Sequence, residues 1–96
     1  MSNTKVGNIK NYSIKNIPNK CVRIDRATIF GNPFKIGEHG SRDEVIERYK
    51  RYFLKRIKYD SDFRKAVKKL KGKVLLCWCR PLPCHGDVIA EWLNNE

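Results

Sequence analysis

The amino-acid sequence predicts an α/β fold: a small Rossmann-like sheet, partly parallel, with a β-α-α-β crossover and a C-terminal helix. An apolar, uncharged run over 74–79 is long enough for a buried strand and too short for a helix. Two segments with the apolar spacing of helices precede this run, and a third, Val88–Leu93, follows it. Strands that alternate with helices in this way form parallel sheets.

Two further strands are expected in the first part of the chain. A short one lies near 5–9. A clearer one covers 20–26, where Val22 and Ile24 alternate with charged residues, which is the pattern of a half-buried strand.

The segment 27–40 that follows is too long for a simple connection. Its stretch 31–33, Gly-Asn-Pro, has the composition of a turn. Long ordered loops in small domains are usually functional, and the alternative is a loop that only packs over the sheet edge. The expected apolar anchors of the loop are Phe30, Phe34 and Ile36.

Two helices are expected between this loop and strand 74–79. The first runs from about Arg42 to Tyr59, because Ser41 and Glu44 have the spacing of a capping box. A second helix starts again at 60–62, with Gly72 as its C-terminal cap. The residues expected to face the core are Val45, Ile46, Tyr49, Tyr52, Phe53, Ile57, Phe63, Ala66, Val67 and Leu70.

The composition limits the classes of protein that are possible. The 96 residues are expected to form a single α/β domain, 1–96. No apolar run approaches the roughly 20 residues that span a bilayer, and the N-terminus lacks the apolar core of a signal peptide. A cytoplasmic protein without a membrane partner is therefore expected, and its four cysteines are expected to be reduced thiols.

The formal net charge of +11 favours a nucleic acid or another polyanion as partner. A basic, solvated face without a partner is the alternative. If a polyanion binds, the expected contacts on the two helices are Arg48, Arg51, Lys55, Lys65, Lys68 and Lys69.

Two loops are expected to meet at one edge of the sheet. If strands 20–26 and 74–79 are parallel, both end at the same edge, and the loops 30–40 and 80–86 converge there. Open α/β sheets bind their ligands at this edge. Because a helix begins near Cys84, unpaired backbone N–H groups could bind an anion, which favours a nucleotide-like or phosphate-bearing molecule.

The candidate catalytic residues are Cys84 as nucleophile or recognition group, His85 or His39 as acid or base, and Asp87 as an orienting or capping group. The alternative is that Cys84 is a small core residue and His85 a helix cap. The candidate ligand-binding residues are Gly31, Asn32, Pro33, Phe34, Cys79, Arg80 and Gly86.

Two other classes of function are weighed against this site. Cys77, Cys79, Cys84 and His85 are zinc-type ligands, but their spacing is poor, so neither a metal nor a cofactor is predicted. A non-enzymatic nucleic-acid- or partner-binding module would explain the charge and leave the polar loops unexplained. Both tryptophans, Trp78 and Trp92, are expected in the core.

Two motifs resemble a known family. They are Gly31-Asn-Pro-Phe34 and Cys77-Trp-Cys-Arg-Pro-Leu-Pro-Cys-His-Gly-Asp-Val88, and the stretches 41–49 and 70–73 match as well. Together they resemble the domain-of-unknown-function family numbered 4326, from about Lys20 onward. The resemblance implies an α/β fold, a site at the two motifs and an occurrence in bacteria and their phages. It implies no reaction, because the activity of that family is not established.

Overall fold

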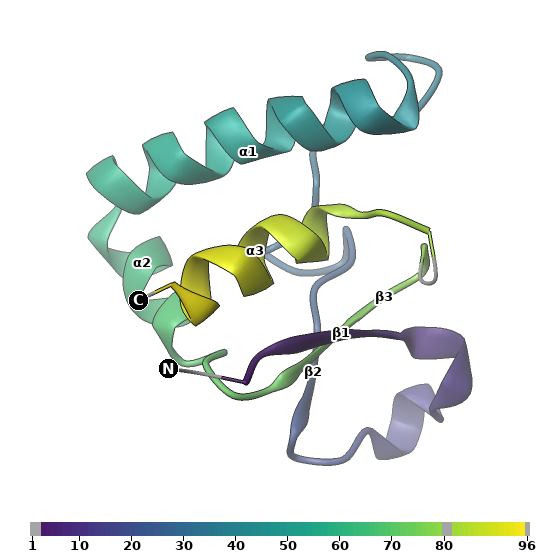
Figure 1. The fold of residues 1–96 in the computed structure, drawn as a ribbon. Helices are drawn as coiled ribbons and strands as arrows, with labels where there is room; N and C mark the ends of the chain where they lie inside the picture. The colour runs from purple at the N-terminus through teal and green to yellow at the C-terminus, as the bar shows by residue number, and fades with distance from the viewer. Residues whose placement is uncertain (1–2, 80–81, 96) are drawn as a thin grey trace.

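The computed structural model describes residues 3–79 and 82–95. In chain order the elements are β1 (Lys5–Asn8), η1 (Ile9–Asn11), η2 (Ile14–Asn16), β2 (Cys21–Arg23), α1 (Arg42–Tyr59), α2 (Ser61–Lys68), β3 (Val74–Cys77) and α3 (His85–Asn94). The elements η1 and η2 are single turns of 3₁₀-helix. Figure 1 shows their arrangement.

The sheet has the strand order β1-β3-β2, and both pairs are parallel. The α/β class and the β-α-α-β crossover from β2 to β3 are therefore confirmed. The register pairs Cys21 with Val74 and Arg23 with Leu76, so the two strands end at the same edge. Both strands are shorter than the sequence pattern indicates. Because β3 ends at Cys77, Cys79 lies in the following loop and not on the strand.

Both faces of β3 are buried. Leu75 and Cys77 belong to the main core, together with residues of all three α-helices. Leu76 belongs to a smaller cluster with Ile9 and Cys21 on the other face. A parallel strand covered on both faces carries a continuous apolar run, which explains the sequence of β3.

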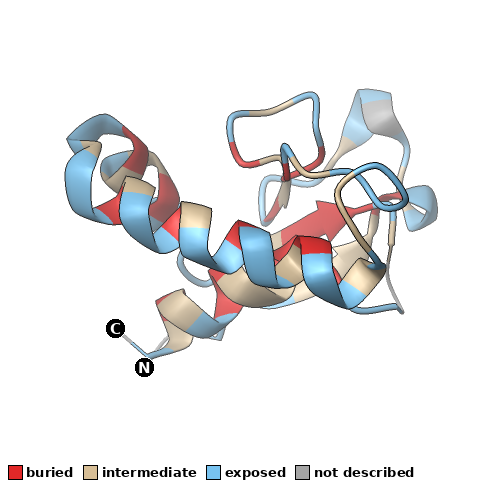
Figure 2. Cartoon of the chain, turned by 90° about the horizontal axis from the view of Figure 1, so that it is seen from above, coloured by how far each residue is buried: buried red, intermediate tan, exposed pale blue. Residues whose placement is uncertain are grey.

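The α-helices lie on one side of the sheet and the 3₁₀ turns on the other (Figure 1). Helix α3 packs on β1 and β3, and α1 packs on α3 and α2. Figure 2 shows buried and exposed residues alternating along α1, as its apolar stripe predicts. The buried residues of α1 are Val45, Tyr49, Phe53 and Ile57.

The predicted start of α1 is confirmed. The backbone N–H of Glu44 donates to Ser41 Oγ at 3.3 Å, and the backbone N–H of Ser41 donates to Glu44 Oε1 at 3.0 Å. The predicted end of α2 is wrong, because its C-cap is Lys69 and not Gly72. Gly72 lies further on, where a φ of +78° turns the chain toward β3.

Of the expected loop anchors, Phe30 is buried and Phe34 is half-buried, but Ile36 is 50% exposed and is therefore no anchor. None of the helices in the described part of the chain combines the length and the apolar character that crossing a bilayer requires.

Candidate functional site

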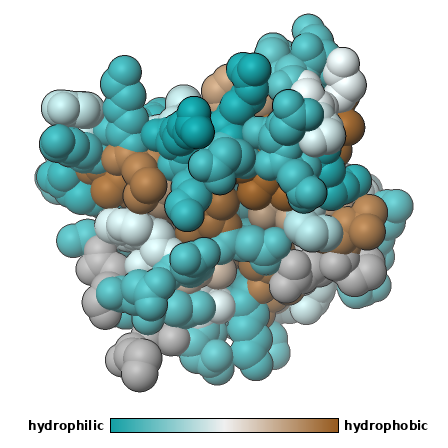
Figure 3. Space-filling model, turned by 45° about the horizontal axis from the view of Figure 1, so that its top comes forward, coloured by the Kyte–Doolittle hydropathy of each residue, from teal (hydrophilic) through white to brown (hydrophobic). Residues whose placement is uncertain are grey.

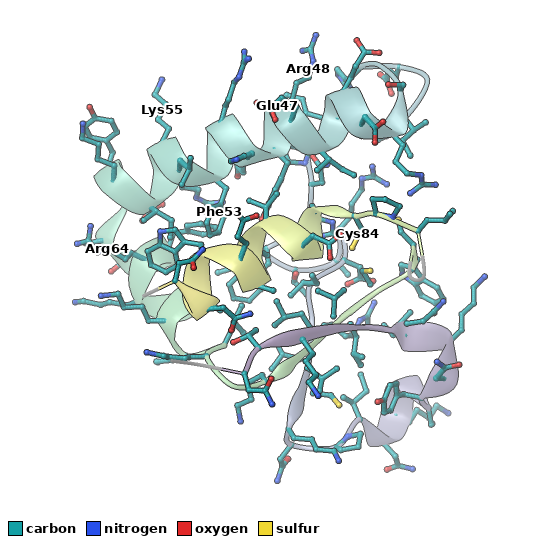
Figure 4. All side chains as sticks on the ribbon, in the orientation of Figure 1. Glu47, Arg48, Phe53, Lys55, Arg64 and Cys84 are labelled. Carbon is teal, nitrogen blue, oxygen red and sulfur yellow. The ribbon has the colours of Figure 1, made fainter. Side chains whose placement is uncertain are left out.

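A pocket of about 310 Å³ lies beyond the carboxyl ends of β2 and β3. One wall comes from the loop after β2 and the other from the loop between β3 and α3, with the first turns of α1 beside them. Figure 4 shows Cys84 at the start of α3, below the N-terminal half of α1. The two loops that the sequence predicts to converge therefore line one cavity.

The first wall is held in place by the residues of its own motif. The Asn32 side chain donates from Nδ2 to the Val45 carbonyl oxygen at 3.2 Å, and its Oδ1 accepts from the Phe34 backbone N–H at 2.9 Å. A Cβ on Gly31 would lie 2.6 Å from Arg26 Cα, so only glycine permits this approach. Asn32 lines the pocket, but its amide already bonds the protein.

Arg26 and Arg42 brace the two loops and also line the pocket. Arg26 donates from Nε to the Asn32 carbonyl oxygen at 3.0 Å and from Nη2 to the Phe34 carbonyl oxygen at 3.2 Å. Arg42 donates from Nη1 to the Pro83 carbonyl oxygen at 3.2 Å, which links the start of α1 to the second loop. Because carbonyl groups are neutral, these bonds do not offset the positive charges of Arg26 and Arg42 at the pocket.

The second wall depends on close packing at the start of α3. A Cβ on Gly86 would lie 2.7 Å from Ile24 Cδ1, and Ile24 is fully buried, so glycine lets the helix approach the end of β2. The Asp87 carboxylate accepts from the backbone N–H of Cys84 at 3.1 Å and caps the helix. The sequence suggests either an orienting or a capping role for Asp87, and this hydrogen bond gives it the capping role.

The His85 ring is buried, 8% exposed, and its Nε2 lies 2.6 Å from the Ile24 carbonyl oxygen. Because a carbonyl oxygen only accepts, Nε2 carries the proton, and Nδ1 of the neutral ring is an acceptor. Burial lowers the pKa of His85, and the charge of Arg26 lowers it further. The hydrogen bond to Ile24 and the nearby carboxylates raise the pKa, but the net shift is downward. His85 therefore lines the pocket as a neutral imidazole.

Cys84 is 2% exposed, and its Sγ lies 3.0 Å from Cys77 Sγ. The hydrogen bond with Cys77 and burial together raise the pKa of the Cys84 thiol far above its ordinary value. A nucleophilic cysteine needs the opposite shift, because the thiolate is the reactive form. The geometry therefore favours Cys84 as a neutral wall of the pocket over a nucleophile.

Asp25 is a site residue that sequence reasoning missed. It follows β2, is 7% exposed and lines the pocket. Its Oδ2 accepts from Arg23 Nη2 at 2.6 Å and from Trp78 Nε1 at 3.0 Å. Burial raises the pKa of Asp25, but these two bonds outweigh it and the net pKa is lowered, so the group is a carboxylate. In the described part of the chain, its buried Oδ1 has no hydrogen-bond partner.

The expectation that Trp78 belongs to the core is wrong. Trp78 is 45% exposed and lines the pocket, with its indole N–H held by Asp25. Trp92 does pack against the core, with its ring centroid 6.0 Å from that of Phe53. The two tryptophans differ because β3 ends before Trp78, which lies in the loop, whereas Trp92 lies on α3 and packs against Phe53 of α1.

The other candidate residues are divided among several places. Asn32, Phe34, Cys79, Cys84 and His85 line the pocket, whereas Gly31 and Pro33 line a neighbouring depression. Gly86 and Asp87 shape the helix start behind the pocket. Arg80 lies outside the described residues. His39 is not at the pocket, and its Nδ1 accepts from the Lys35 backbone N–H at 2.9 Å.

The remaining lining residues are Arg26, Ala27, Ile36, Arg42, Val45, Ile46, Cys77 and Pro83. The predicted strand 20–26 includes Asp25 and Arg26, whereas β2 ends at Arg23 and leaves both residues at the carboxyl edge of the sheet. No signal in the sequence marks Arg42, which reaches the pocket only because α1 starts beside it.

No metal centre forms among the described residues, where no group of three or more His, Cys, Asp or Glu side chains is placed to hold an ion. The basic residues proposed on the helices, Arg48, Arg51, Lys55, Lys65, Lys68 and Lys69, are all exposed. Figure 3 shows a surface dominated by hydrophilic side chains with narrow hydrophobic strips between them.

A three-stranded parallel sheet with one pocket wall after β2 and another after β3 defines a small α/β protein with a cleft at the carboxyl edge of its sheet. The chain belongs to the domain-of-unknown-function family DUF4326, whose model matches residues 7–95.

Two viral proteins are similar to this chain. The uncharacterized 12.4 kDa protein in the nrdA-td intergenic region of Enterobacteria phage T4 is 41% identical over 74 residues, which cover 77% of this chain and 68% of that protein. The uncharacterized protein R718 of Acanthamoeba polyphaga mimivirus is 32% identical over 68 residues, 62% of this chain and 48% of the viral protein. No solved structure matches the chain.

Proposed function

We propose that the protein binds a nucleotide-like, phosphate-bearing ligand in the pocket at the carboxyl edge of its sheet. The observation that carries the proposal is the distribution of charge in that pocket. Arg26 and Arg42 supply positive charge, while Asp25 and the neutral His85 supply hydrogen-bond acceptors. A nucleotide has the complementary groups, because its phosphate is anionic and its base and sugar carry N–H and O–H donors.

The size and polarity of the pocket support this class of ligand. A volume of about 310 Å³ is at the lower end of small-molecule sites. Val45, Ile46 and Phe34 give the walls apolar surface against which a flat base can pack.

If the protein also processes its ligand, His85 is the better candidate for acid–base work. Its lowered pKa keeps the ring neutral near pH 7, and Nδ1 is then a proton acceptor. Cys84 is a poor nucleophile because its thiol pKa is raised. Ligand binding is therefore the central part of the proposal, and a reaction would be tested only after a ligand is found.

The experiment is a titration with the common ribonucleoside and deoxyribonucleoside 5′-monophosphates, followed by calorimetry. At least one should bind with 1:1 stoichiometry. The variant Ile46→Trp places a large side chain on the pocket wall and should abolish binding. Leu54→Trp is the matched control on the same helix, at a 45% exposed position outside the pocket, and should bind like the wild type. Absence of binding by every nucleotide, or normal binding by Ile46→Trp, would refute the proposal.

A second candidate function is a non-enzymatic module that binds nucleic acid or a protein partner through the basic helices. The exposure of all six proposed Lys and Arg residues favours it. Two of them have local contacts, since Arg51 pairs with Glu47 at 3.7 Å and Arg48 lies over the Phe34 ring at 5.9 Å. This function predicts binding that weakens steeply with salt and is unaffected by Ile46→Trp.

A further inference from the structure

A second depression adjoins the pocket. Its volume is about 480 Å³, and it shares Arg26 and Asn32 with the pocket as lining residues. The loop from Arg26 to Phe34 therefore lies between the two hollows. An extended molecule that occupies the pocket can continue over this loop into the depression.

The depression is cationic. It is lined by Arg26, Lys35 and Arg56, and none of its lining residues, all within the described part of the chain, is acidic. Arg56 is held rigidly, because Nη1 donates to Tyr52 Oη at 2.7 Å and the guanidinium lies 4.1 Å from the centre of the Phe63 ring. Asp60 offsets part of its charge from outside the depression, at 3.3 Å from Nε.

Trp78 lines the pocket and is partly exposed. Among the described residues no aromatic or cation–π contact involves Trp78, and the residue is 45% exposed. Its indole N–H is nevertheless fixed by the Asp25 carboxylate at 3.0 Å. A ring that is oriented and partly exposed is suited to stack on a flat base, because the entropy of ordering it is already lost in the free protein.

These features exceed what a single nucleotide needs. One phosphate can be held by Arg26 and Arg42 of the pocket, whereas Lys35 and Arg56 of the depression can hold a second phosphate. A nucleic-acid strand supplies phosphates at regular spacing and bases that stack on any aromatic ring. A double helix would not place a single base in the pocket without unpairing it.

We infer that the ligand of the pocket is part of a single-stranded nucleic acid, which runs over the Arg26–Phe34 loop into the cationic depression and stacks a base on Trp78. This inference rests on the proposed function. It assigns the nucleic acid to the loop surface and not to the basic faces of α1 and α2.

The test is fluorescence anisotropy with labelled single-stranded DNA and RNA of about eight nucleotides, a length within the usual range of single-strand sites. The oligonucleotide should bind more tightly than any mononucleotide. Trp78→Ala should weaken oligonucleotide binding about five- to 150-fold, the range measured for loss of one stacked base. Trp78→Phe keeps an aromatic ring and should recover part of the lost affinity for the oligonucleotide. This recovery would show that the missing ring, and not misfolding, weakens binding in Trp78→Ala.

Lys35→Ala tests the depression. Removing one phosphate contact from a single strand should reduce the slope of log affinity against log salt by about 0.7, while mononucleotide binding stays unchanged. Lys65→Ala is the matched control, an exposed lysine on α2 outside both hollows, and should have no effect.

The outcomes separate this inference from the proposed function. If mononucleotides bind but the oligonucleotide binds no more tightly, the inference is wrong and the proposed function stands. If neither binds, both fail. If Lys65→Ala weakens the oligonucleotide as much as Lys35→Ala does, the strand binds the helices, and the assignment to the loop surface is overturned.

Discussion

The Nε2 atom of His85 lies 2.6 Å from the carbonyl oxygen of Ile24, and this contact joins the start of α3 to the end of β2. Residues 61 positions apart in the chain are thereby brought into contact. Gly86 makes the contact possible, since a Cβ there would lie 2.7 Å from Ile24 Cδ1. The hydrogen bond requires the ring to donate from Nε2, and burial disfavours a second proton on Nδ1.

The stability of the fold should therefore depend on the charge of His85. Its pKa is lowered in the folded state by burial and by Arg26, while Asp25 and Asp87 act in the opposite direction. Below the unfolded-state pKa of about 6.5, the unfolded chain binds a proton that the folded state does not. The free energy of unfolding should consequently fall as the pH decreases from 7.5 to 5.5, as measured by urea denaturation.

The variant His85→Gln should lose less stability than the wild type over the same pH interval, although it is less stable at pH 7.5. His39→Gln, on the loop before α1, retains His85 and should therefore keep the pH dependence of the wild type. An identical pH dependence in wild type and His85→Gln would contradict the assignment to His85.

Gly31→Ala should destabilise the protein by about 1–3 kcal/mol, the range for introducing an atom into occupied space. The new Cβ would lie 2.6 Å from Arg26 Cα and 2.8 Å from the Asp25 carbonyl oxygen, which are backbone atoms that cannot rotate away. Gly7→Ala is a milder substitution for comparison, because the atom nearest to its new Cβ would be Val74 Cγ1 at 3.2 Å. Equal unfolding free energies for Gly31→Ala and the wild type would show that the loop packs differently.

Tyr49→Phe should cost about 1–3 kcal/mol of unfolding free energy, because it leaves the buried carbonyl oxygen of Phe30 without its donor. The Tyr49 hydroxyl, on a residue that is fully buried, donates to that oxygen at 2.9 Å. Tyr52→Phe is the control on the same helix, where the hydroxyl accepts from the partly exposed Arg56. The Tyr52 variant should lose less stability, and the reverse order would contradict the proposed role of Tyr49.

The four thiols should differ in their reaction with a disulfide reagent such as 5,5′-dithiobis(2-nitrobenzoate). Cys79 is partly exposed and should react first, whereas Cys21, Cys77 and Cys84 are buried and should react only when the protein unfolds. Cys79→Ser should remove the fast phase. A fast phase that persists in this variant but disappears in Cys84→Ser would show that Cys84 is a reactive thiol after all.

Several elements follow from local sequence alone. The bounds of α1, Arg42–Tyr59, match the prediction because its capping box and apolar stripe act within a few turns of the helix. The long connection between the two strands allows the parallel pairing of β2 and β3 but does not require it, and the structure shows that they are parallel. Given this pairing, the two loops meet because parallel strands end at the same edge of the sheet.

The chemical state of the site could not be predicted in this way. The exposure of Trp78, the carboxylate of Asp25 and the neutral thiol of Cys84 depend on neighbours far away in the chain. Burial and long-range hydrogen bonds set these properties, and neither has a local signature in the sequence. Local sequence thus determines the main helices and the composition of the two loops, whereas tertiary pairing of distant strands decides where these loops meet and which of their side chains line the pocket.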